Sequence, residues 1–339
     1  MFCPKCGTQN ARIATHTSLA VLLAALVACG QSGGNQPMSA GASPPSAAAG
    51  AGSTNATATA AEVAAEARGK IRCPAKIKSA SRDPKAPVDD VVGVRPGMTF
   101  EEAASVVMCT NDLMVVTADT SRRFNIQTYG QTIRQGFSAR FAEPRVQKTS
   151  KQIMQEMQAD FTARSGNAIR EDMKPGQSKW YVSTMGMPGQ ERVIGAAREE
   201  WFEEGRNPTM DSVEQALLKK YGTPTQSQKT GGQTLLRWAY DPFGRLVTET
   251  SPLFHQCRGT ADPDGGTNFS PDCGIVVAAA VYPTRENPGL GRYLQVGVLD
   301  QANGYEALTG TEQALQQLES NRKAKEIADA AKNADAPQL

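Results

Sequence analysis

The chain has 339 residues, and its 36 Lys and Arg against 34 Asp and Glu give a formal net charge of +2. No basic stripe is visible in this balanced composition, which argues against a nucleic-acid-binding protein. With two histidines and no glycine loop of the phosphate-binding kind, the sequence offers little that indicates catalysis.

Residues 1–28 have the features of a signal peptide. The apolar run 19–28 is about ten residues long, whereas a membrane-spanning helix needs about twenty. Lys5 and Arg12 precede it, no acidic residue accompanies them, and Ala28 is the small residue that cleavage requires. We therefore predict that residues 1–28 are removed, which leaves equal numbers of basic and acidic residues. The alternative is a short buried or spanning helix that is never cleaved.

The junction that follows, Leu26-Val-Ala-Cys29-Gly30, resembles the lipobox of bacterial lipoproteins. The resemblance implies that Cys29 is acylated, with chains such as palmitate, and becomes the first residue of a membrane-tethered protein. A Gly30 in place of Asp resembles outer-membrane sorting signals. We therefore expect a lipid-anchored cell-envelope protein at the outer membrane, facing the periplasm.

The leader itself contains a second pattern. Met1–Thr8 includes Cys3-Pro-Lys-Cys6 and resembles the first knuckle of a zinc ribbon. Cys3 and Cys6 could occupy two corners of a tetrahedral Zn²⁺ site, but a closed structural site needs four ligands, and His16 is the only other candidate nearby. If the leader is retained, the alternative is a membrane-tethered zinc-ribbon protein. If it is cleaved, no cofactor is expected.

Residues 29–69 are rich in Ala, Ser, Gly, Thr and Pro, and such a composition buries too little apolar surface to offset its ordering entropy. We predict a disordered leash in which residues 58–67 form a transient helix.

Four of the seven cysteines remain after residue 29, an even number that suggests disulfide bonds in an exported protein. Three connectivities are possible. We favour the sequence-local pairs Cys73–Cys109 and Cys257–Cys273, because each would join segments at one end of the domain.

Two helices carry the clearest local signals. Thr99 with Glu102 forms a capping box at the start of the first, and Asp211 with Glu214 is the corresponding pair for the second. The second helix is predicted to stop at Gly222.

A helix that begins Gly97-Met-Thr-x-x-Glu-Ala, and one that ends in Gly222-x-Pro224 before the strand Trp238-x-Tyr240, resemble the repeat unit of two exported families. These are the β-lactamase-inhibitor proteins and the small lipoprotein of the β-barrel assembly machinery. The resemblance implies an α+β fold of two helix-on-antiparallel-sheet units. We place these units at residues 70–145 and 146–305, followed by a C-terminal helix and tail over 306–339.

A third helix is predicted over 150–164, where Ile153, Met157 and Phe161 recur every four residues. We expect this stripe to pack into a core, although Met154 and Met157 could also line an adaptable groove. A solvated helix is predicted for the C-terminal segment, from about residue 311 to 332. Strands are predicted at residues 180–185, 192–202, 234–240, 274–282 and 292–299.

Five aromatic residues could form an exposed sheet face that binds another envelope protein, since Trp and Tyr dominate interface hot spots. The alternative for each is burial in the core. They are Trp180, Tyr181, Trp201, Trp238 and Tyr240.

The sequence offers weaker candidates for catalysis than for protein binding. His255 has no serine elbow or identifiable acidic partner, and disulfide-bonded cysteines cannot act as nucleophiles. The acidic loop 262–272 could bind Ca²⁺, but it lacks the third acidic position and closing Glu of an EF-hand, and we favour a polar loop closed by the Cys257–Cys273 disulfide. Glu199-Glu200 is interpreted as a solvated run. We predict a non-catalytic binding or scaffold module, with an envelope hydrolase of unknown substrate as the alternative.

Overall fold

The computed structural model describes residues 56–75, 86–119, 123–164, 173–333 and 335. Cys3, Cys6, the predicted signal peptide, the predicted lipidation site Cys29 and most of the predicted leash lie outside these residues. None of the described helices is long and apolar enough to cross a membrane.

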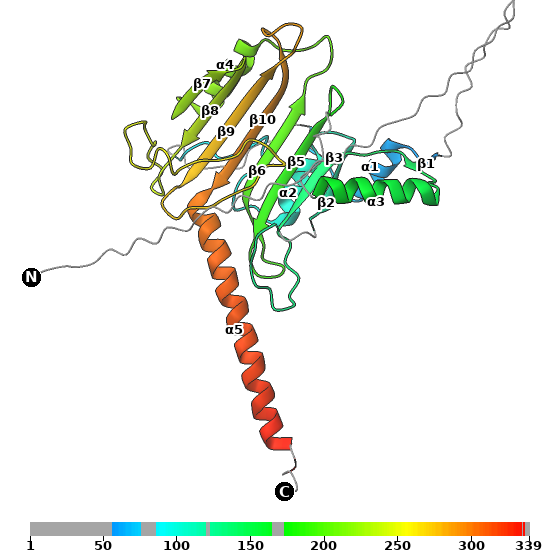
Figure 1. Ribbon diagram of the computed structural model, residues 1–339, viewed down its shortest axis with the longest axis vertical. Coiled ribbons are helices and arrows are strands. Elements are labelled where there is room, and N and C mark those ends of the chain that lie inside the picture. Colours follow the sequence, from blue (N-terminus) through cyan, green and yellow to red (C-terminus); the bar gives the residue numbers. More distant parts are fainter. Residues whose placement is uncertain (1–55, 76–85, 120–122, 165–172, 334, 336–339) are drawn as a thin grey trace, which may run out of the picture. The chain divides into compact units, whose positions relative to one another are not determined.

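The fold is α+β, as predicted, and its centre is one eight-stranded antiparallel sheet (Figure 1). In spatial order the strands are β2 (Met114–Ala118), β3 (Gly136–Phe141), β5 (Ser178–Met185), β6 (Arg192–Trp201), β10 (Gly291–Asp300), β9 (Ile275–Pro283), β8 (Gln233–Ala239) and β7 (Gln226–Thr230). A separate two-stranded sheet pairs β1 (Ala56–Ala58) with β4 (Arg145–Val146). The helices are α1 (Ala60–Arg68), α2 (Phe100–Met108), α3 (Ser150–Arg164), α4 (Met210–Tyr221) and α5 (Gln301–Asn333).

The large sheet consists of two halves, each with a helix followed by four of its strands, and β4 and α3 are inserted between the second and third strands of the first half. In the first half α2 precedes the strands β2, β3, β5 and β6, and in the second half α4 precedes β7, β8, β9 and β10. The halves join through β6 and β10, which pair from Gly195↔Leu299 to Trp201↔Tyr293. The first meander runs to Trp201 and therefore continues well beyond residue 145, where the sequence placed the boundary between units.

Both helices begin at local caps and pack on the same face of the sheet. The Thr99 hydroxyl and the Glu102 carboxylate form the predicted capping box of α2. In α4 the prediction was wrong: Thr209, rather than Asp211, is the N-cap, and its hydroxyl accepts from the backbone N–H of Ser212 at 3.1 Å. Asp211 instead lies in the first turn, where its charge favours the positive end of the helix dipole.

The main core lies between these helices and the sheet. Its helical residues are Phe100, Ala103, Ala104, Val107, Met108, Met210, Val213, Leu217 and Tyr221. Trp180 and Trp238 are fully buried on the facing strands, and the Trp238 indole N–H donates to the Gly222 carbonyl at 2.9 Å. These two tryptophans belong to the core and do not form an exposed face, because α2 and α4 cover the side of the sheet to which they point.

The two disulfide bonds are those predicted. Cys73–Cys109 joins the segment after α1 to the C-cap of α2. Cys257–Cys273 closes a 16-residue separation within the long loop between β8 and β9, and both of its cysteines are completely buried.

The prediction of disorder up to residue 69 was wrong for its last part, because residues 56–68 form β1 and α1. A capping box at Thr59 starts α1, whose Ala64 is buried. Arg68 then binds Asp112 at 3.1 Å, next to the start of β2. These contacts fix a segment whose composition alone suggests a leash.

The bounds of α3 are as predicted, but its apolar stripe is not in a core. Ile153, Met154, Met157 and Phe161 are between 47% and 74% exposed. Four-residue spacing predicts a helix with one apolar side, yet it does not reveal whether another element packs on that side.

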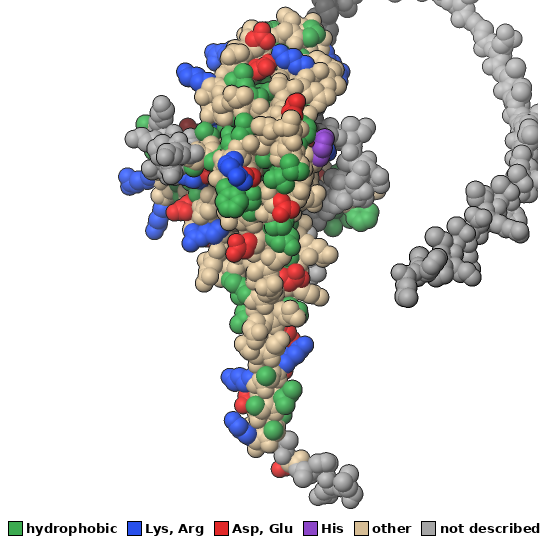
Figure 2. Space-filling model, turned by 90° about the vertical axis from the view of Figure 1, so that its left-hand side faces the viewer, with side chains coloured by type: hydrophobic (Ala, Val, Ile, Leu, Met, Phe, Trp, Pro, Cys, Tyr) green, Lys and Arg blue, Asp and Glu red, His purple; other side chains and the backbone are tan. Residues whose placement is uncertain are grey.

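The C-terminal helix α5 begins at Gln301, directly after β10 and about ten residues before the predicted start. Its first turns pack on the sheet, and Thr311 and Leu315 are its last buried residues. Beyond Leu315 its acidic and basic side chains alternate along the surface, as Figure 2 shows, in agreement with the predicted solvated helix.

Candidate functional site

The face of the large sheet opposite α2 and α4 carries polar and aromatic side chains, and α5 and the β8–β9 loop cover part of it; we call it the open face. Side chains alternate along a strand, so the neighbours of core residues such as Trp180 and Leu236 point to this face. Cross-strand pairing places Lys179, Glu199 and Gln295 side by side there, on β5, β6 and β10.

A buried polar network connects these strands. Both carboxylate oxygens of Glu199 accept hydrogen bonds, one from the Trp201 indole N–H at 2.9 Å and one from the Gln295 carboxamide at 2.6 Å. The ammonium of Lys179 lies 3.9 Å from the Glu199 carboxylate and forms an ion pair with Asp264. Glu199 is only 1% exposed, so its interpretation as part of a solvated run was wrong. Buried charges require such partners.

Next to the network, aromatic rings are stacked across three strands. The Trp201 ring lies 5.0 Å from that of Tyr293, which in turn lies 4.2 Å from that of Tyr282, both in parallel stacking. The Arg292 guanidinium covers the Trp201 ring at 4.4 Å. Trp201 is buried, whereas Tyr282 and Tyr293 remain partly exposed and form the accessible part of this stack.

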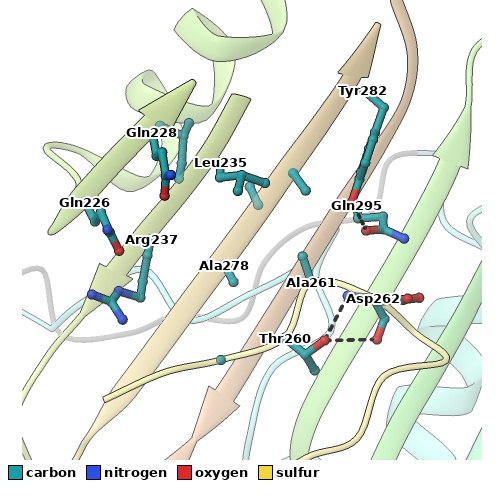
Figure 3. A pocket seen from close by; sticks show the side chains of 14 residues that line it. Gln226, Gln228, Leu235, Arg237, Thr260, Ala261, Asp262, Ala278, Tyr282 and Gln295 are labelled. Carbon is teal, nitrogen blue, oxygen red and sulfur yellow. Dashed lines mark hydrogen bonds between the residues drawn. The ribbon is translucent and has the colours of Figure 1, made fainter. Parts of the chain in front are cut away.

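A pocket of about 360 Å³ lies beside the stack, bounded by β7, β8, β9 and the loop 259–262 (Figure 3). The base of the pocket consists of Ala278 and Ala280 of β9, whose small side chains leave space above the strand. The loop comes close because Gly297 has no side chain: a Cβ there would lie 2.1 Å from the Thr260 carbonyl oxygen. Longer side chains surround the floor, namely Gln226, Gln228, Leu235, Arg237, Tyr282 and Gln295.

Of the remaining predicted aromatic residues, Tyr181 is buried and Tyr240 is half-buried. Tyr181 is on the open face but 9% exposed; its hydroxyl donates to Asp119 at 2.6 Å, and Arg123 lies 3.6 Å from its ring centre. Burial, followed by the hydrogen bond to Asp119, raises the pKa of Tyr181. Tyr240 packs against the main core, and burial raises its pKa as well. Of the five, only Trp201 contributes to the stack.

Sequence reasoning missed Tyr282, Tyr293 and Arg237. Tyr282 and Tyr293 lie in strands that the sequence does predict, at positions that pair across β9 and β10. The two-residue period of those strands puts Tyr282 on one side with Ala278 and Ala280, but only the pairing of β6 with β10 and of β10 with β9 places both tyrosines beside Trp201.

The residues that the sequence offers for catalysis or metal binding are either isolated or bound to other side chains. His255 is exposed, and its ring packs against that of Phe254 at 5.0 Å. Asp272 accepts from Gln256 at 2.8 Å, and Asp264 binds Lys179, which favours the interpretation of residues 262–272 as a polar loop. Over the described residues, no three His, Cys, Asp or Glu side chains are grouped as a metal site would require.

Comparisons with known proteins give no relative: no family model, no curated protein and no solved structure matches the chain.

Proposed function

We propose that the protein is a lipid-anchored cell-envelope protein that binds another envelope protein through the open face of its sheet, without catalysing a reaction. The observation that carries the proposal is the asymmetry of the sheet. Two helices cover one face, whereas the other face is covered in part by α5 and the β8–β9 loop and presents Tyr282 and Tyr293 beside a pocket. Partly exposed aromatic rings next to a concavity are typical of interface hot spots.

The accessible rings of the open face are also supported by buried side chains, which favours binding. Trp201 is fixed by its hydrogen bond to Glu199 and supports Tyr293 from below. An aromatic group that is already ordered loses little conformational entropy when a partner packs on it. The polar network thus has a role in positioning the accessible rings.

The anchor is proposed from the lipobox-like segment at Cys29. Replacing Cys29 by Ser should abolish incorporation of labelled fatty acid and release the protein from the membrane fraction. Unchanged labelling of the variant would refute the lipid anchor while leaving the proposed binding face untouched.

The binding face is tested by photo-cross-linking in cells with two matched positions. A photoreactive amino acid replaces Gln228, which borders the pocket, or Gln215, which is exposed on α4 on the opposite side of the sheet. We expect a specific partner to be captured from position 228 and not from position 215. Capture from position 215 alone, or no capture from either position, would contradict the proposal.

A further inference from the structure

Arg237 is a partly buried arginine that has no acidic partner among the described residues. It lies in β8, where it pairs with Gln226 on β7 and with Ala278 on β9, and its side chain borders the pocket on the open face (Figure 3). The side chain is about half buried, and Phe254 lies 4.7 Å from its guanidinium on the side of the β8–β9 loop.

The charge of Arg237 is not compensated. Among the described residues no carboxylate forms an ion pair with it, and its buried Nε has no hydrogen-bond partner. The neighbouring charge is also positive: burial first, and the nearby Arg258 second, hold the pKa of the Arg237 guanidinium below its ordinary value. A partly desolvated cation beside a second cation destabilises the unliganded fold.

Several other partly buried arginines of this fold are paired with acids, whereas Arg123 donates to the Gly265 carbonyl at 2.7 Å. Arg134 binds Glu191 at 2.9 Å, and Arg198 binds Glu200 at 2.7 Å. The pocket does contain one acid, Asp262, but its carboxylate accepts from the backbone N–H of Asp264 at 3.0 Å. Figure 3 shows Asp262 beyond Thr260, on the far side of the pocket from Arg237.

The groups around Arg237 are suited to a carboxylate. The planar guanidinium can donate two parallel hydrogen bonds to one carboxylate group, and the carboxamide of Gln226 supplies a further donor from the adjacent strand. A volume of about 360 Å³ exceeds what the carboxyl group alone needs and leaves room for the rest of an acidic side chain.

We propose that this pocket receives an aspartate or glutamate side chain of the partner protein, whose carboxylate pairs with Arg237. The inference rests on the proposed function, and it names the chemistry by which the open face selects its partner. Arg258 contributes long-range attraction for the same acid.

The first test compares stability with binding in the mature lipidated protein. If Arg237 serves a ligand, Arg237→Met should leave the melting temperature unchanged or raise it, because an uncompensated charge is removed. The same change should weaken binding of the partner captured from position 228 by about 30-fold or more. Arg206→Met, which removes an 81% exposed side chain on a surface loop, is the control and should change neither quantity.

Arg237→Lys keeps the charge but loses the planar pair of donors, so we expect about a tenfold weaker complex with the fold intact. If Arg237→Met does not fold, the affinity of Arg237→Lys for the partner still tests the carboxylate inference. Binding by Arg237→Lys and Arg237→Met at wild-type strength would overturn the carboxylate inference and leave the proposed function standing.

A charge exchange then identifies the partner group. Arg237→Glu should abolish the complex, and replacing the acidic residue that cross-links near position 228 by Arg should restore it. If no partner is captured, the proposed function itself fails. Glutarate is then the probe: an increase in melting temperature that Arg237→Met abolishes would assign the pocket to a free carboxylate and overturn a partner side chain as its ligand.

Discussion

Removing the carboxylate of Glu199 should destabilise the protein strongly. In Glu199→Ala, the Trp201 indole and the Gln295 carboxamide both lose their acceptor, and each buried donor without a partner costs about 1–3 kcal/mol. Lys179 keeps Asp264 but loses the carboxylate at 3.9 Å. Breaking a buried ionic network of this kind costs about 3–5 kcal/mol.

Glu199→Gln separates charge from hydrogen bonding, since its carboxamide oxygen can still accept from one of the two donors. We expect a loss of about 1–3 kcal/mol, intermediate between alanine and the wild type. The matched control is Glu203→Ala, which removes a 59% exposed glutamate and should change stability by less than about 0.5 kcal/mol.

Urea unfolding followed by tryptophan fluorescence measures these differences, because the midpoint shifts while the slope stays constant. Near-ultraviolet circular dichroism reports in addition whether Trp201 keeps its stacking on Tyr293. A loss below about 1 kcal/mol in Glu199→Ala, with an unchanged aromatic spectrum, would refute the view that the network holds the open face in place.

Three further predictions concern the scaffold. Thr209→Ala should cost about 1 kcal/mol because it removes the cap of α4, whereas Asp211→Ala should cost a few tenths; equal losses in urea unfolding would contradict the assigned cap. Replacing Cys257 and Cys273 together by Ala should cost about 3 kcal/mol for a loop of this length, and a loss below about 1 kcal/mol would mean that the disulfide hardly constrains the unfolded chain. Ending the chain after Ser320 should leave the melting temperature within about 2 °C of wild type, while Leu315→Ala, which empties a site that is 1% exposed, should cost about 3 kcal/mol; a large loss on truncation would show that the distal part of α5 packs on the domain.

Local signals in the sequence predicted much of the scaffold. The capping box at Thr99 needs only residues within one turn, and so its prediction was confirmed. The disulfide pairs followed from proximity in the chain. The α4 cap was wrong by two residues because Thr209 and Asp211 are both good cap residues. Thr209 is the extended residue before the helix and forms a bridge with the distant Leu290, which no local pattern predicts.

The open face could not be located from sequence, because the alternation of a strand does not say which side is covered. Trp180 and Tyr181 are neighbours in β5, yet one faces the helices and the other the open face. In the sequence Glu199 cannot be distinguished from its neighbour Glu200. It is buried beside Gln295 because β6 pairs with β10. Whether Arg237 has an acidic partner depends on which residues of the β8–β9 loop lie next to it, and no local sequence pattern predicts those neighbours.

Paired photo-cross-linking is the most direct test of whether the open face binds a protein partner. The capture yield is compared between Gln228 and Gln215 in otherwise wild-type protein, and again after Tyr282 and Tyr293 are both replaced by Ala. We predict one specific partner from position 228, none from position 215, and loss of capture when the two tyrosines are removed. Equal capture from both positions, or capture that survives the loss of both tyrosines, would contradict the account.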